Sequence, residues 1–209
     1  MLIDEYRTIK GAGQGFYSEL RSKFLAFAYP VENADEAMHI ISGMKREYHD
    51  ARHVAYAYMI GADCNVFRCN DDGEPSGTAG RPILGQIRSS GLTNVLVAVV
   101  RYFGGVKLGT SRLAEAYRAA AAGALSNCEI VERYVTVKFS VRFSYEQMNN
   151  VMRILRNSES KIIENTYDEG CKITVEVRQS KVGDLQASLE KVETLFIDKE
   201  FRKNGNKKN

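Results

Sequence analysis

One continuous stretch, residues 91–118, constrains the fold of this 209-residue chain more than any other. It contains an uninterrupted apolar run at residues 95–100, which predicts a strand buried on both faces of a sheet. Three glycines follow at positions 104, 105 and 109, and they allow the backbone to turn tightly. Apolar side chains then recur at helical spacing from Leu113 to Ala124. The sequence therefore predicts a buried strand, a glycine-rich turn and a helix in direct succession.

The glycine-rich turn is the first candidate binding site. A helix N-terminus presents free N–H groups and the positive end of the helix dipole, so it favours an anion. Lys107 and Arg112 add positive charge, and Thr110 or Ser111 is expected to cap the helix. The turn does not match a phosphate-binding P-loop, because Lys107 precedes Gly109 instead of following it. The alternative is a turn that needs glycine for its geometry alone and whose charges are solvated.

A polar, turn-rich loop at residues 71–80 is the second candidate site. Its carboxylates at Asp71, Asp72 and Glu74 are crowded enough to hold a hard cation or to activate a water molecule. The same residue types form ordinary turns, so a purely structural loop is the alternative. His53 is a further candidate base. Neither zinc-ligand spacing nor a nucleophile elbow is present, so we expect no metal and no cofactor.

Four motifs follow one another along the chain: SKF at residues 22–24, ARHVAYAY at 51–58, DDGEPSGTAG at 71–80 and RYFGGVKLGTSRLAEAY at 101–117. Together they resemble the IMPACT family, and in particular its bacterial YigZ-type members. The resemblance implies that the acidic loop and the turn at residues 101–103 form one functional surface. It implies no reaction, so we expect a binding protein rather than an enzyme.

The last third of the chain predicts a second domain. Apolar and polar residues alternate at 135–143, which indicates a strand buried on one face. A helix, two strands, another helix and a weak strand at 195–197 follow, with Ser144 as the expected cap of the first helix. This is the order of the ferredoxin-like βαββαβ unit. We expect an α+β protein with domains at 1–132 and 133–200 and a basic tail at 201–209.

The resemblance implies the same division into two domains. In the IMPACT family the first domain has the ribosomal protein S5 domain-2-like fold, and the second domain of bacterial members is ferredoxin-like. Side by side they resemble domains IV and V of elongation factor G. Because these fold analogues touch RNA, the resemblance connects the chain to translation by analogy of fold alone.

The N-terminal segment predicts a hairpin and a helix. Residues 6–30 are interpreted as two strands joined by a wide turn containing Gly11, Gly13 and Gly15. Asn33 and Glu36 then form a capping-box pattern that begins an amphipathic helix.

Net charge says little about partners. The formal charge of +3 arises in the last eleven residues, which carry five cations and one carboxylate, and the rest of the chain carries −1. We expect the basic tail at residues 201–209 to be disordered, and residues 199–209 to be dispensable for folding. No membrane-spanning run and no targeting pattern is present, so a cytoplasmic location is expected.

Three functions are compatible with these features, and we favour the first. It is a translation-associated protein that binds RNA or the ribosome, in which Arg101 and Lys107 meet phosphates and Tyr102 or Phe103 stacks on a base. The second is an enzyme or sensor that binds a phosphorylated small molecule at residues 104–111. The third is a regulatory scaffold that binds a protein partner in translation control. The candidate binding surface comprises Lys23, His53, Asp71, Asp72, Gly73, Glu74, Arg101, Tyr102, Phe103, Gly104, Gly105, Lys107, Gly109, Thr110 and Ser111.

Overall fold

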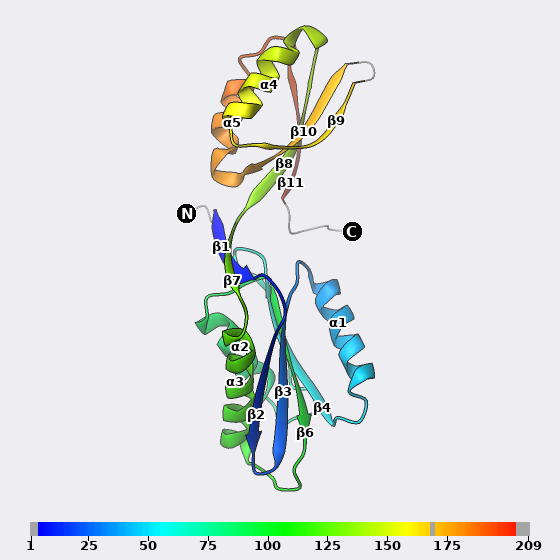
Figure 1. Ribbon diagram of the computed structural model, residues 1–209, viewed down its shortest axis with the longest axis vertical. Coiled ribbons are helices and arrows are strands. Elements are labelled where there is room, and N and C mark those ends of the chain that lie inside the picture. Colours follow the sequence, from blue (N-terminus) through cyan, green and yellow to red (C-terminus); the bar gives the residue numbers. More distant parts are fainter. Residues whose placement is uncertain (1–3, 168–169, 204–209) are drawn as a thin grey trace. The chain divides into compact units, whose positions relative to one another are not determined.

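The computed structural model describes residues 4–167 and 170–203, and these form two compact units (Figure 1). The first unit is Tyr6–Arg133. The second begins at Tyr134 and also includes residues 4–5.

A five-stranded antiparallel sheet forms the centre of the first unit. Its strands stand in the order β2-β3-β6-β4-β5. The bounds are Gly13–Glu19 for β2, Ser22–Pro30 for β3, Val95–Tyr102 for β6, His53–Ile60 for β4 and Val66–Asn70 for β5. The apolar strand predicted at residues 95–100 is β6, the middle strand, and helices cover both of its faces.

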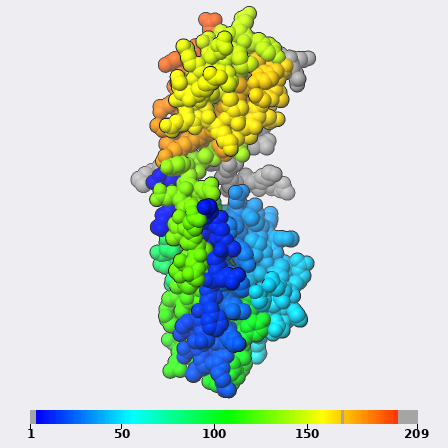
Figure 2. Space-filling view, viewed as in Figure 1, coloured from blue at the N-terminus to red at the C-terminus, as the bar shows by residue number. Residues whose placement is uncertain are grey.

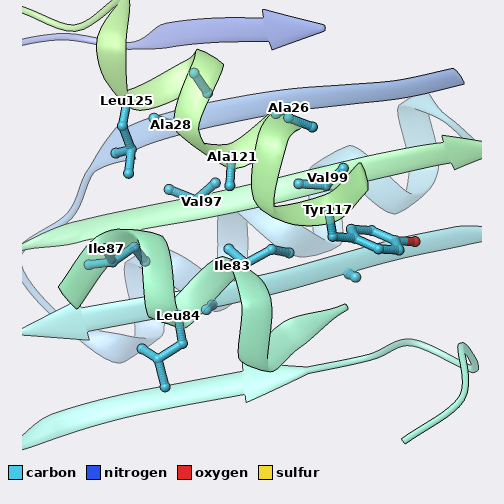
Figure 3. Packing of buried hydrophobic residues seen from close by; sticks show 14 of the residues in the cluster. Ala26, Ala28, Ile83, Leu84, Ile87, Val97, Val99, Tyr117, Ala121 and Leu125 are labelled. Atoms are coloured by element: carbon cyan, nitrogen blue, oxygen red, sulfur yellow. The ribbon is translucent and has the colours of Figure 1, made fainter. Parts of the chain in front are cut away.

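Helices α2 (Gly80–Ser89) and α3 (Thr110–Ser126) cover one face of this sheet, and α1 (Ala34–Glu47) covers the other (Figure 1). Figure 3 shows Val97 and Val99 of β6 packed beneath Ala121 and Tyr117 of α3. The predicted N-cap of α1 is confirmed, because Asn33 Oδ1 accepts a hydrogen bond from the N–H of Glu36 at 2.8 Å. The reciprocal bond of the capping box differs, because the Glu36 carboxylate accepts from the N–H of Glu32 at 2.8 Å. Because apolar side chains are buried on both faces, this sheet is closely packed and holds the residues at the ends of its strands in fixed positions.

The predicted N-terminal hairpin is wrong in its turn. Gly13 and Gly15 lie inside β2, where a Cβ on Gly15 would come within 2.3 Å of the backbone nitrogen of Ala124. These glycines therefore let α3 pack directly on the strand, and Figure 2 shows the blue N-terminal strands beside the green atoms of α3. A further strand, β1 (Glu5–Ile9), pairs instead with β7 (Ile130–Tyr134), which the sequence did not predict.

The actual hairpin turn joins β2 to β3 through Leu20 and Arg21. Both residues have left-handed backbone angles, with φ of 44° and 65°, in a position that usually requires asparagine or glycine. Because neither residue type signals such a turn, the sequence pattern could not locate it.

Replacing Leu20 with asparagine is expected to stabilise the protein by about 0.5–1 kcal/mol, since asparagine tolerates the left-handed conformation better. Leu20→Ala lacks the amide group that hydrogen-bonds locally in this conformation, so it should give no gain. Urea denaturation of both variants measures the difference, and an unchanged or lower stability of Leu20→Asn would contradict the assignment of strain.

The second unit has the predicted β-α-β-β-α-β order of elements. Its antiparallel sheet has the strand order β11-β8-β10-β9, and α4 and α5 pack on the apolar face of that sheet. The bounds are Thr136–Phe143 for β8, Met148–Asn157 for α4, Lys161–Thr166 for β9, Cys171–Arg178 for β10, Val182–Leu189 for α5 and Phe196–Lys203 for β11. Ser144 does not cap α4, because one turn of 3-10 helix, Tyr145–Gln147, intervenes.

The predicted start of the basic tail at residue 201 is wrong. Strand β11 continues through Lys203, and it pairs Arg202 with Lys138 and Lys203 with Val137. Residues 201–203 therefore belong to the sheet, and deleting residues 199–209 would remove more than half of strand β11. The rest of the predicted tail, residues 204–209, lies outside the described residues.

Candidate functional site

Three neighbouring strands place a row of side chains at one end of the first unit's sheet. Strand register aligns Phe24 of β3 with Arg101 of β6, and Arg101 with His53 of β4. All three face α2 and α3, because they continue the alternation of the core positions that face these helices. A cation is thus placed where the apolar face of the sheet ends.

Glu74, from the loop at residues 71–80, lies over this row and neutralises Arg101. Its Oε1 accepts hydrogen bonds from Arg101 Nη1 at 2.6 Å and from the Tyr117 hydroxyl at 2.8 Å. The Glu74 and Arg101 side chains are only 4% and 7% exposed. His53 Nε2 stands 4.0 Å from the other carboxylate oxygen. Burial, together with the nearby Glu74 carboxylate, raises the pKa of Tyr117 above its ordinary value, so this phenol stays protonated and donates.

The other two carboxylates of the loop also bind internal donors. Asp71 accepts hydrogen bonds from the N–H groups of Gly77, Ala79 and Gly80 at 2.8–3.0 Å, so it occupies the N-terminus of α2. Asp72 accepts from the N–H of Val54 at 2.7 Å and pairs with Lys45.

The hydrogen bonds of the loop favour its structural alternative over the cation and general-base hypotheses. The Asp72 carbonyl oxygen lies 2.7 Å from His53 Nδ1, so it accepts that ring N–H and orients the imidazole. Within the described part of the chain, no cluster of histidine, cysteine or acidic side chains has the arrangement to hold a metal ion. The loop's carboxylates hold the backbone in place, which favours its structural interpretation.

Asp71 makes a pH-dependent contribution to stability. Burial acts to raise the pKa of Asp71, but hydrogen bonds from Gly77, Gly80 and Ala79 outweigh burial and hold the pKa below its ordinary value. A lowered folded-state pKa stabilises the protein above the unfolded value of about 4, and that stability is lost as the pH falls further.

Asp71→Asn is therefore expected to lower the free energy of unfolding at pH 7 by about 1–3 kcal/mol. It should also make stability less sensitive to pH below about 5 than in the wild type. Urea denaturation at several pH values measures both effects, with the exposed Glu32→Gln as control. A parallel pH profile for Asp71→Asn and wild type would contradict this role.

The glycine turn has the tight geometry that the sequence predicted. A Cβ on Gly104 would lie 2.1 Å from the carbonyl carbon of Arg21, and Gly105 and Gly109 have positive φ of 86° and 75°. The expected cap is wrong, because Gly109 is the N-cap of α3 and no side chain caps it. Thr110 and Ser111 are instead the first two residues of the helix.

The turn and the β2–β3 hairpin meet at the same end of the sheet (Figure 1). The N–H of Gly104 donates to Ser22 Oγ at 3.2 Å, so the two segments are joined directly. Exposed basic and apolar side chains gather on them, and we call this set the tip surface. It comprises Leu20, Arg21, Lys23, Phe103, Val106 and Lys107.

The structure therefore divides the predicted site residues into two groups. His53, Asp71, Asp72, Glu74 and Arg101 form an internal network, whereas Lys23, Phe103 and Lys107 are exposed on the tip surface. Tyr102 belongs to neither group, because it faces α1, is half-buried and donates to Asp50 at 2.9 Å.

Four residues that lie in the internal network or on the tip surface were not among the predicted site residues: Phe24, Tyr117, Leu20 and Arg21. Tyr117 was interpreted only as part of an apolar helix stripe, although its hydroxyl was a signal that a buried partner is needed. Phe24 was part of a motif, but its contact with Arg101 depends on strand register.

The fold and site define a two-unit mixed α/β protein whose first unit presents a basic and aromatic surface supported by a buried ion pair. The Impact N-terminal domain family matches residues 20–125, which include both the internal network and the tip surface. The chain therefore belongs to the IMPACT family.

Relatives match over most of the chain. IMPACT family member YvyE of Bacillus subtilis is 31% identical over 86% of this chain and 83% of its own length. IMPACT family member YigZ of Escherichia coli is 30% identical over 81% of this chain and 84% of its own length.

A solved structure described as a hypothetical protein has a TM-score of 0.74 at 27% identity, covering 95% of this chain and all of that one. Yih1, described as a two-domain translational regulator, gives a TM-score of only 0.38, which is too low to establish a common fold. None of the helices in the described part of the chain has the length and apolar character needed to cross a bilayer.

Proposed function

We propose that this protein is a translation-associated protein that binds RNA or the ribosome through its tip surface. The observation that carries the proposal is that Arg21, Lys23, Lys107 and Phe103 are all exposed on the two joined segments at this end of the sheet. Cations that meet phosphates and an aromatic ring that meets bases are the two elements of RNA recognition. A cytoplasmic location belongs to the same proposal.

Charge distribution around the tip supports this assignment. The acidic loop carries Asp71, Asp72 and Glu74, but internal donors engage all three carboxylates. Arg101 cannot meet phosphate as the sequence predicted, because it is buried and paired with Glu74. We therefore assign Arg101 a supporting role and assign phosphate contact to Arg21, Lys23 and Lys107.

Fold analogy points in the same direction. We propose that the first unit is S5 domain-2-like and the second ferredoxin-like, as in domains IV and V of elongation factor G. The strand order β11-β8-β10-β9 supports the ferredoxin-like assignment. The solvent-facing positions of its central strands carry Lys138, Ser140, Lys172 and Thr174 in place of the aromatic pairs of RRM domains, so we place base contact in the first unit.

Reversing two tip charges tests the proposal. Lys23→Glu/Lys107→Glu is expected to weaken binding of a fluorescein-labelled single-stranded RNA at least tenfold at low salt. It should also make the dependence of log K on log salt shallower by about 1.4, for two lost phosphate contacts. Fluorescence anisotropy across a salt series gives both numbers, and co-sedimentation with purified bacterial ribosomes tests the larger target.

Lys10→Glu/Arg133→Glu is the matched control, because both side chains are exposed and lie on segments away from the tip. It changes the net charge by the same amount. Equal loss of binding in both double variants would show that only net charge matters, and the tip surface would then have no special role.

A second candidate function is binding of a phosphorylated small molecule at the start of α3. It is favoured by one observation: Asp71 occupies the N-terminus of α2, whereas no side chain caps α3 at Gly109. Thermal denaturation with nucleotides and sugar phosphates tests it, because a ligand at about 100 times its Kd stabilises a protein by about 2.7 kcal/mol. Unchanged melting with all of these anions would rule it out.

The protein-scaffold alternative loses support because the acidic loop's carboxylates are engaged internally.

A further inference from the structure

We infer that Phe103 is a preformed stacking platform for one unpaired RNA base, and that the protein therefore selects single-stranded over duplex RNA. This inference rests on the proposed function, since it names the chemistry by which the tip surface would hold RNA. It commits to Phe103 and leaves out Tyr102, which is half-buried on the opposite face of the sheet and bonded to Asp50.

The Phe103 ring shares a buried cation with a second aromatic ring. The Arg101 guanidinium carbon lies 5.5 Å from the centre of the Phe24 ring and 5.6 Å from the centre of the Phe103 ring. Phe24 is fully buried, whereas Phe103 is 43% exposed. The Phe103 ring thus meets a buried cation while part of the residue stays open to solvent.

Arg101 is fixed independently of any ligand. Glu74 accepts a hydrogen bond from its guanidinium at 2.6 Å. The Tyr117 hydroxyl donates to the same carboxylate oxygen and holds it in place. A cation–π contact with an immobile guanidinium restricts the Phe103 ring. An aromatic ring that is already ordered loses less conformational entropy when a base stacks on it, so binding is stronger for the same contact area.

The backbone beside the ring leaves room for a ligand. Nothing lies within 4 Å of a Cβ built on Gly105 or on Gly109, whereas Gly104 is packed tightly against the hairpin. Lys107 lies between Gly105 and Gly109, and Arg21 lies on the hairpin that packs against Gly104. We assign phosphate contact to these two cations.

Single-strand preference follows from the geometry of stacking. Each base inside a duplex has both faces covered by its neighbours, so only an unpaired, unstacked base can lie on a protein ring. Stacking of one base on an aromatic side chain is worth about 1–3 kcal/mol and tolerates any base, so the preference should be for strandedness rather than sequence.

The chain contains no tryptophan, which allows a direct test. Phe103→Trp places the sole indole at the platform, and its fluorescence should be quenched by a single-stranded RNA 12-mer but not by the same strand annealed to its complement. In the otherwise unchanged chain, Phe103→Leu should weaken single-strand binding about five- to hundredfold. Phe16→Leu, at an exposed aromatic position on β2 elsewhere in the same unit, is the control and should bind as wild type.

The outcomes separate this inference from the proposed function. If Phe103→Leu binds RNA as tightly as wild type while Lys23→Glu/Lys107→Glu does not, the stacking inference is wrong and the proposed function stands. Equal quenching by duplex and single strand would also overturn it. If the wild type binds neither RNA nor ribosomes, both ideas fail. Circular dichroism of Phe103→Leu separates lost binding from lost folding.

Discussion

Replacing Glu74 with glutamine is expected to lower the free energy of unfolding by about 3–5 kcal/mol, because the buried Arg101 charge is left without its counter-ion. The Glu74–Arg101 pair is almost fully excluded from solvent, and Arg101 Nε is the one buried side-chain polar atom in the described residues without a hydrogen-bond partner. The glutamine amide oxygen can still accept a hydrogen bond, but the buried guanidinium, already incompletely satisfied at Nε, loses the negative charge that compensates it. Urea denaturation followed by circular dichroism measures the loss.

Glu115→Gln provides the matched control. Glu115 also pairs with an arginine, Arg118, but that pair lies on the exposed face of α3. Surface pairs contribute about 0–1 kcal/mol, so this variant should stay close to wild type. Similar losses of unfolding free energy in the two variants would show that burial does not increase the contribution of the Glu74–Arg101 pair to stability.

A double variant connects the pair to function. Replacing a whole buried ion pair with apolar side chains is often neutral or stabilising, so Glu74→Leu/Arg101→Met should recover part of the stability lost in Glu74→Gln; the recovery stays incomplete because the buried Tyr117 hydroxyl loses its acceptor. It removes the cation beneath Phe103, however, and should therefore weaken RNA binding. Full recovery of both stability and RNA affinity would show that the ion pair does not support the platform.

Gly104→Ala is expected to destabilise the first unit by more than about 3 kcal/mol or to prevent its folding. The added Cβ would overlap the backbone at Arg21 and Ser22, at 2.1 and 2.3 Å, and neither backbone atom can move without opening the hairpin. Thermal melting and urea denaturation of the purified variant measure the effect.

Two other glycines serve as controls for this prediction. Gly105→Ala has open space but a positive φ, so it should cost about 1–2 kcal/mol from backbone strain alone. Gly85→Ala, on the exposed face of α2 with nothing within 4 Å, should stabilise the protein by up to about 1 kcal/mol. A Gly104→Ala variant as stable as Gly105→Ala would contradict the close approach of turn and hairpin.

Local patterns in the sequence determined several elements of this protein. The apolar run at residues 95–100, the glycines after it and the helical repeat beyond them predicted the central strand, the turn and α3. Asn33 predicted the start of α1, and alternation from residue 135 predicted β8. Each of these features depends on residues that are near one another in the chain, so a single sequence contains the necessary information.

Only the tertiary structure decided which side chains meet. Arg101 has the same local sequence whether it is exposed or buried, and its burial follows from the register that places it between Phe24 and His53 and under Glu74. The role of Gly15 likewise depends on α3, whose contacting residues are more than 100 positions away in the chain. Strand register and helix packing are set by the summed burial of many distant residues, which no local pattern records. For this reason the sequence predicted candidate site residues, and the structure decided that Arg101 is buried against Glu74 while Phe103 and Lys107 are exposed.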